Sequence, residues 1–248
     1  MTPKIVLITG AARGLGKGLV ERYLAQPNTV VIAANRDPES SASQALSRLP
    51  VAGGSRLIVV KLDAAVDTDA AAAVKELRKK HGIEHLDVVI ANAGISFVWP
   101  AVADVRIADL ERHVRVNVYG VVTLYQATRE LLGRAREEPV FAPMGSSAGF
   151  IADQPPIPNA AYGPSKAALH WFIVRINAEN EWLNAFALNP GWVQTELGNN
   201  GARGLGLEKA PVGLEESLDG MMKMLAITNK GKHGGKTVSY DGEVSDLK

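Results

Sequence analysis

The sequence predicts an α/β fold, a doubly wound parallel sheet of about seven strands flanked by helices. Short apolar runs alternate along the chain with segments of helical periodicity. The runs lack the polar alternation of half-exposed strands, which is typical of strands buried on both faces. Because α/β domains of about 200–250 residues commonly stay undivided, we expect residues 1–248 to form a single domain.

Seven runs are the candidate strands, and we expect the last of them to lie at the edge of the sheet. In chain order they are KIVLIT from Lys4, TVVIAA from Thr29, RLIVVKL from Arg56, LDVVIA from Leu86, VFAPM from Val140, NAFALN from Asn184 and KTVSY from Lys236. Two stretches look irregular, the proline-rich 149–161 and the glycine-rich 196–213. Both follow predicted strands, so they are candidate pocket walls at the carboxyl edge of the sheet.

Composition excludes several classes of function. The formal net charge of +1 lacks the basic excess that nucleic-acid binding needs, and the 46% hydrophobic content is not that of a membrane protein. There is no cysteine, and the five histidines show no metal-ligand spacing, so we expect no metal. The first residues do not resemble a secretory signal, and we expect a cytoplasmic protein.

A glycine-rich turn follows the first strand and begins a helix. It reads TGAARGLG, with Gly10, Gly14 and Gly16 spaced G-x-x-x-G-x-G. Glycines let the backbone approach a pyrophosphate, and a helix N-terminus supplies unpaired amides and partial positive charge. The order strand, turn, helix therefore predicts a dinucleotide site of Rossmann type.

Two arginines indicate which dinucleotide is bound. Arg36 follows the second strand, where an acid would grip the ribose of NAD, and Arg13 lies in the first turn. A guanidinium matches a 2′-phosphate in charge and geometry, so NADP(H) is favoured. The neighbouring Asp37 leaves NAD open.

Six motifs in order along nearly the whole chain resemble the short-chain dehydrogenase/reductase family. They are TGAARGLG, the NAG of Asn92, Ala93 and Gly94, Asn117, Ser146, YGPSK from Tyr162 to Lys166, and PGWVQT from Pro190 to Thr195. The start and the tail TVSYDGE resemble the carbonyl-reductase-like branch with fungal norsolorinic acid ketoreductases. The resemblance implies a nicotinamide cofactor, a small-molecule ketone or alcohol substrate, and a homodimer or homotetramer built on helices around Asn117 and Tyr162.

Tyr162 and Lys166 suit carbonyl reduction on chemical grounds. A carbonyl that accepts hydride becomes an alkoxide, which needs a proton donor and a hydrogen-bond donor at its oxygen. We expect Tyr162 to give the proton and Lys166, four residues on and on the same helical face, to lower its pKa. Ser146 would steady the substrate oxygen, with Ser147 as the rival.

Other roles come from the resemblance alone. Asn117 would belong to a proton relay that reaches Lys166 through water. Asp63 would touch adenine, although a strand-end aspartate is often a turn residue. The remaining cofactor contacts would be Leu15, Asn92, Ala93, Gly94, Tyr162, Lys166, Pro190, Val193 and Thr195.

Aromatic side chains indicate the kind of substrate. Phe97, Trp99, Phe150 and Trp192 lie in loops that leave the carboxyl edge of neighbouring strands. Such rings could converge above the nicotinamide and stack on a flat ligand. We therefore expect a bulky aromatic, polyketide-like ketone of secondary metabolism.

Two other functions fit parts of the sequence. GSSAG fits the nucleophile elbow of a serine hydrolase, with Ser147, Asp219 and His233 in the right chain order. The proline-rich stretch after it argues against the helix that such an elbow requires. A non-catalytic NADP(H)-sensing protein is the second alternative, since one fold can host many functions.

Overall fold

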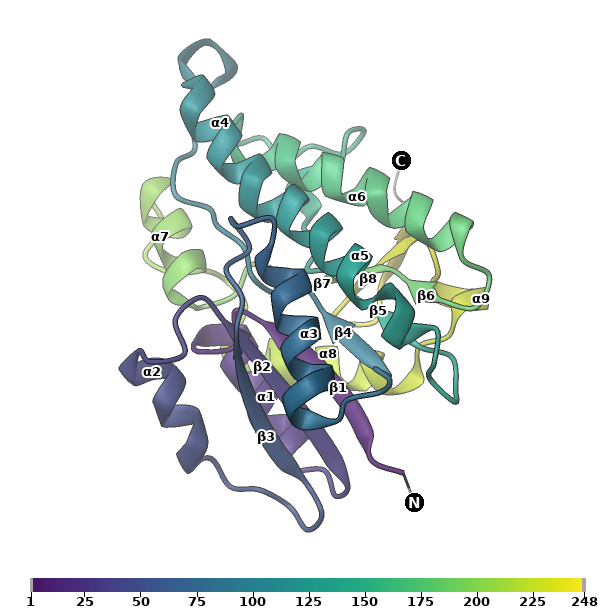
Figure 1. Cartoon of the computed structure of the whole chain (residues 1–248). Helices are drawn as coiled ribbons and strands as arrows, with labels where there is room; N and C mark the ends of the chain where they lie inside the picture. Colours follow the sequence, from purple (N-terminus) through teal and green to yellow (C-terminus); the bar gives the residue numbers. More distant parts are fainter. Residues whose placement is uncertain (1, 247–248) are drawn as a thin grey trace.

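The computed structural model describes residues 2–246, with helices on both faces of a central sheet (Figure 1). The strands are β1 (Lys4–Thr9), β2 (Thr29–Asn35), β3 (Arg56–Lys61), β4 (Val88–Ile90), β5 (Val140–Phe141), β6 (Asn184–Ala185), β7 (Ala187–Asn189), β8 (Lys236–Ser239) and β9 (Val244–Asp246). One sheet has the order β3-β2-β1-β4-β5-β6, with parallel neighbours, and a second has the order β7-β8-β9.

The predicted strand NAFALN is divided because its pairing changes along its length. β6 pairs with β5, and β7 pairs with β8 in parallel register. A bridge from Met144 to Leu188 ties the two sheets together, so the expected count of about seven parallel strands is confirmed. The edge position of the last strand is wrong, because the chain turns at Gly242 (φ 96°) and β9 pairs antiparallel with β8.

Each face of the sheet carries its own helices. They are α1 (Gly14–Leu24), α2 (Ser41–Gln44), α3 (Asp69–His81), α4 (Ile107–Val114), α5 (Gly120–Leu132), α6 (Tyr162–Glu179), α7 (Glu196–Gly204), α8 (Leu214–Ile227) and α9 (Lys230–His233). Leu7 of β1 packs with α3, α5 and α6, whereas the next residue, Ile8, packs with α1 and α8. The central strands are apolar on both faces for this reason.

Helix α7 corrects the prediction that residues 196–213 are irregular. Thr195 caps its first turn, because the hydroxyl accepts a hydrogen bond from the amide of Gly198 at 3.1 Å. A Cβ at Gly204 would lie 2.9 Å from the Trp99 ring, so the glycines bring the helix close to that indole. Packing therefore overrides the low helix propensity of glycine here.

The strand order indicates where a ligand would bind, at the carboxyl edge of the sheet next to β1. β1 lies between β2 and β4, so successive crossovers leave it in opposite directions and open a crevice at its carboxyl end. The glycine-rich turn leaves β1 at this point, and the NAG turn follows β4 beside it. Among residues 2–246, no helix combines the length and apolar character that crossing a membrane requires.

Candidate active site

The glycine-rich turn has no room for a side chain at Gly10 or Gly16. Gly10 and Gly14 have φ angles of 62° and 53°, which L side chains rarely adopt. A Cβ at Gly16 would lie 2.3 Å from the carbonyl oxygen of Gly10 and 2.5 Å from Nδ2 of Asn92. That amide donates to the Gly10 carbonyl at 3.1 Å, and Ala93 Cα lies 3.0 Å from a Cβ built on Gly10. The two turns predicted to hold the cofactor thus support each other.

The turn also presents free donors. α1 begins at Gly14 with no side-chain cap on its first amides, and Leu15 is tucked against the core. Asn35, at the end of β2, accepts from the amide of Ala11 at 2.8 Å. Its Nδ2 is buried and has no hydrogen-bond partner among the described residues. Uncapped amides, an unpaired donor and three glycines in the turn fit the phosphates and ribose of a dinucleotide.

Residues of the predicted adenosine end lie beyond the turn. Arg36 is exposed directly after β2. Arg13 is also exposed and forms an ion pair with Glu196 at the start of α7. Asp63 lies two residues past β3, where its carboxylate accepts from the amide of Ala65 at 2.9 Å, as a turn residue does. Both arginines are exposed, and the contact of Arg36 or Arg13 with a 2′-phosphate stays a prediction.

The loop after β7 reaches back to the glycine-rich turn. Thr195 Cγ2 is 3.5 Å from the Cβ position of Gly14. Val193 is buried and pairs with Val212, and the carbonyl of Pro190 accepts from the Ser217 hydroxyl at 2.7 Å. Thr195 therefore lies beside the glycine-rich turn, while Pro190 and Val193 are anchored to residues at the start of α8 and just before it.

Tyr162 begins α6 and meets Ser146, which follows β5. A hydrogen bond from Ser146 works to lower the pKa of Tyr162, but burial outweighs it and raises that pKa to about 12. Ser147 is exposed, and Ser146 is the serine that contacts the tyrosine. A phenol with this pKa stays protonated at neutral pH and can donate.

Lys166 lies next to Tyr162 on α6. Its ammonium is buried, donates to the carbonyl of Met144 at 2.7 Å, and lies 5.6 Å from the centre of the Tyr162 ring. Burial lowers the pKa of Lys166 to about 8. Burial is the largest influence on the pKa of Tyr162, and the expected lowering of that pKa by the Lys166 ammonium stays a prediction.

Asn117 lies in a π-helical turn (Arg115–Tyr119) between α4 and α5. Its Oδ1 accepts from the amide of Ile95 at 2.9 Å, and its Nδ2 donates to the carbonyl of Ile95 and to the Ser165 hydroxyl. The side chain therefore ties the loop after β4 to α6. A water-mediated link from Asn117 to Lys166 stays a prediction.

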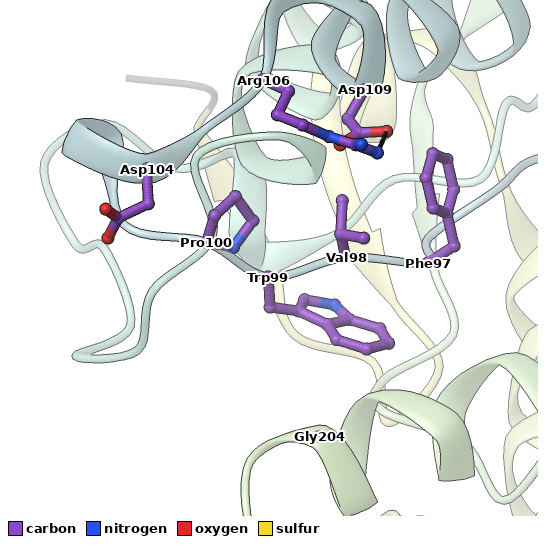
Figure 2. Close-up of a pocket in the computed structure, with 8 residues that line it drawn as sticks. All are labelled: Phe97, Val98, Trp99, Pro100, Asp104, Arg106, Asp109 and Gly204. Atoms are coloured by element: carbon purple, nitrogen blue, oxygen red, sulfur yellow. Dashed lines mark hydrogen bonds and ion pairs between the residues drawn. The ribbon is translucent and has the colours of Figure 1, made fainter.

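Two of the four predicted aromatic residues line one cavity of about 490 Å³. In Figure 2 the Trp99 indole lies over Gly204 of α7, with Phe97 at one end and the Arg106–Asp109 ion pair on the opposite side. The lining residues are Phe97, Val98, Trp99, Pro100, Asp104, Arg106, Asp109 and Gly204. The cavity is therefore partly aromatic and carries charged groups on its wall.

The other two aromatic residues lie elsewhere. Trp192 borders Gly201 of α7, as Trp99 does, but its Nε1 donates to the carbonyl of Gly198 at 2.9 Å. Phe150 packs against His170 with ring centres 5.9 Å apart. The structure brings three of the rings around α7 and its neighbouring loops, and Phe150 contacts α6.

The residues of a serine hydrolase are not assembled. Asp219 pairs with Arg22, and Nδ1 of the buried His233 lies 3.2 Å from the Thr228 hydroxyl. Ser147 begins a short 3-10 turn, Ser147–Gly149, and not the helix of a nucleophile elbow. The described contacts give no support to Ser147 as a nucleophile.

Sequence reasoning missed two supporting residues, His113 and Asn35. His113 stacks on Phe97 at 4.4 Å and meets the Tyr162 ring edge-on at 6.3 Å, which links the cavity wall to the tyrosine. Its position four residues before Asn117 on one helical face was an available signal. The only sequence signal for Asn35 is that it is a polar residue at the end of an apolar strand.

Comparisons with known proteins agree with this geometry. A family model for short chain dehydrogenases matches residues 4–205. The chain is 41% identical over 240 residues to norsolorinic acid ketoreductase nor1 of Dothistroma septosporum, covering 95% of this chain and 89% of that protein. It is 39% identical over 239 residues to norsolorinic acid ketoreductase of Aspergillus parasiticus, with 95% and 88% covered. NADPH-bound carbonyl reductase from chicken fatty liver superposes with a TM-score of 0.85 at 26% identity, covering 99% of this chain and 100% of that one.

Proposed function

Because this chain belongs to the short-chain dehydrogenase family, we propose that it reduces a ketone to an alcohol with NADPH. The observation that carries the proposal is the meeting of Ser146, Tyr162 and Lys166 where the loop after β5 lies against α6. Such a group can hold a carbonyl oxygen and protonate it. The proposal takes residues 1–248 as one cytoplasmic domain that assembles as a homodimer or homotetramer.

Tyr162 is the proton donor in this mechanism. Its hydroxyl stays protonated at neutral pH because burial raises its pKa to about 12. NADPH, when bound, would supply the hydride that reduces the carbonyl carbon. As negative charge develops on the carbonyl oxygen, Tyr162 transfers its proton there and Ser146 donates a hydrogen bond. The phenolate that forms then needs a cation nearby.

Lys166 is that cation. Its ammonium faces the Tyr162 ring. The attraction between the ammonium and the phenolate grows as negative charge forms on the tyrosine oxygen, because a buried site screens charges weakly. The same ammonium would hold the nicotinamide ribose. Asn117 keeps the loop after β4 fixed against α6 and would carry the relay that returns a proton to this pair.

NADP(H) is favoured over NAD by charge at the adenosine end. Arg36 is exposed after β2, and Arg13 needs only to leave its solvent-exposed partner Glu196 to reach a phosphate. Exposed ion pairs are worth about 0–1 kcal/mol, so this exchange costs little. The turn residues Gly10, Gly14 and Gly16 would face the pyrophosphate.

A bulky aromatic ketone is the substrate that we propose. Phe97 and Trp99 line an open depression of about 490 Å³, so they present an aromatic surface against which a flat ring system can stack. The two fungal relatives are named for reducing norsolorinic acid, which supports a role in secondary metabolism. Trp192 lies beside Trp99 at Gly201 of α7, where the two indoles are 3.8 and 3.4 Å from the Cβ position of that glycine.

A screen of ketones for NADPH oxidation tests the proposal. Aliphatic, monocyclic and polycyclic aromatic ketones are mixed with the enzyme and NADPH, and loss of reduced nicotinamide absorbance is followed. We expect turnover, fastest with polycyclic ketones. Tight NADPH binding with no turnover of any ketone would instead support the non-catalytic sensor.

A further inference from the structure

The proposed mechanism leaves a buried histidine beside the active site without a role. His170 lies on α6, four residues after Lys166 and eight after Tyr162. That spacing puts the three side chains on one face of the helix. The imidazole is 4% exposed, which makes an unused polar group here costly unless it has a partner.

The partner of His170 is the backbone of the catalytic serine. The amide of Ser146 donates to Nε2 of His170 at 3.4 Å. A Cβ at Gly145 would lie 3.3 Å from the same nitrogen, so the chain passes close over the ring. Phe150 packs on the imidazole from the other end of the loop, with ring centres 5.9 Å apart. Residues 145–150 therefore fold around His170.

The loop is anchored to α6 at a second point. A Cβ at Gly149 would lie 2.7 Å from the carbonyl carbon of Lys166, so this part of the loop lies directly on the helix backbone. Within the loop, the Ser146 hydroxyl accepts from the amide of Ala148 at 3.2 Å. The serine is thus held through its side chain by the loop and through its own amide by His170.

The protonation state of His170 suits an acceptor. Burial and the nearby Lys166 ammonium lower the pKa of His170 to about 4, so the ring is neutral at physiological pH. Since Nε2 accepts from Ser146, the proton of the neutral ring is on Nδ1. No other acceptor for the Ser146 amide is found among the described residues.

We propose that His170 is a positioning residue that holds the backbone of Ser146 so that the serine hydroxyl meets Tyr162. This inference rests on the proposed roles of Ser146 and Tyr162 in ketone reduction. It assigns no contact with substrate to His170, which acts only through the serine. Removal of the acceptor leaves a buried amide unpaired, and the loop shifts to satisfy it.

Two substitutions of similar size test whether the hydrogen-bond acceptor at His170 is what matters. His170→Gln keeps an oxygen at about the reach of Nε2, whereas His170→Met has similar length and no strong acceptor. We expect His170→Met to lower kcat about tenfold, the scale of one lost hydrogen bond to a catalytic group. His170→Gln should recover most of that loss, and neither change should alter the dissociation constant for NADPH.

A double-mutant cycle with Ser146→Ala tests the route of the effect. If His170 acts through the serine hydroxyl, His170→Met should lower kcat little further once that hydroxyl is gone. Equal losses in the two backgrounds would overturn the proposal, and so would failure of His170→Gln to restore activity.

A titration that needs no turnover separates this inference from the proposed function. The Ser146 hydrogen bond lowers the pKa of Tyr162, so His170→Met should raise that pKa and His170→Gln should not. Ultraviolet difference titration of the phenolate gives the value, with Tyr162→Phe as the blank for the other tyrosines. An unchanged Tyr162 pKa in a folded His170→Met protein would refute the positioning role, even if no ketone were reduced. If His170→Met fails to fold, His170→Asn replaces it, because its amide is too short to reach the Ser146 amide: a raised Tyr162 pKa supports the proposal, and a value equal to wild type overturns it.

Discussion

Gly16→Ala is a substitution whose cost can be worked out from the glycine-rich turn. The new Cβ would lie 2.3 Å from the Gly10 carbonyl oxygen and 2.5 Å from Nδ2 of Asn92. Both neighbours are fixed, because they hydrogen-bond to each other at 3.1 Å. Overpacking and loss of this bond together cost about 4 kcal/mol, and the better helix propensity of alanine returns about 1 kcal/mol.

The net loss of about 3 kcal/mol should lower Tm by roughly 6–12 °C in a chain of this length. NADPH affinity should fall at least about tenfold, because the turn must move from the position that fits a pyrophosphate. Gly53→Ala is the control, since no heavy atom lies within 4 Å of its Cβ position. Thermal unfolding and NADPH fluorescence measure both effects. Equal stability and equal NADPH affinity in the two variants would refute this reasoning.

Three further outcomes follow from the same site. Arg36→Ala should weaken NADPH binding by roughly 1.5–3 kcal/mol and leave NADH binding unchanged; equal effects in fluorescence titrations would mean that Arg36 does not contact the phosphate. NADPH binding to wild type should weaken as pH rises through about 8, because the pKa of Lys166 is about 8 and its ammonium is lost there. Lys166→Met should bind weakly with no such pH dependence, and the same dependence in that variant would assign it to another group. Trp99→Ala should raise KM for polycyclic aromatic ketones by about tenfold through lost stacking, and an equal rise for acetone-sized ketones would contradict an aromatic binding wall.

The strand runs and the glycine-rich turn could be predicted from sequence because their signals are local. An unbroken apolar run such as TVVIAA needs burial on both faces, and the structure buries every residue of β2. Helix α7 could not be predicted, because its glycines disfavour a helix and only contacts with Trp99 and the Thr195 cap offset that cost. The pairing of β9 depended on a turn at Gly242 that no hydrophobic pattern marks.

The site residues also divide into those with a local sequence signal and those whose placement depends on tertiary contacts. Spacing on one helix placed Tyr162 and Lys166 together, since four residues make about one turn. The choice of Ser146 over Ser147 needed the loop conformation, which depends on packing against α6. Phe150 was grouped with the cavity residues because it follows a strand, but the loop around His170 carries it to α6. The direction that a loop takes after the end of a strand depends on tertiary packing, which the local sequence does not specify.

Comparison of the wild type with Tyr162→Phe tests the proton-donor assignment most directly. With a ketone that the wild type reduces, kcat is measured for both proteins, and the NADPH dissociation constant is measured in the same buffer. We predict a fall in kcat of roughly 10²–10⁴ with NADPH affinity preserved, because the phenyl ring keeps its packing and loses only the hydroxyl that donates the proton. A Tyr162→Phe protein that turns over ketone at the wild-type rate would contradict the assignment.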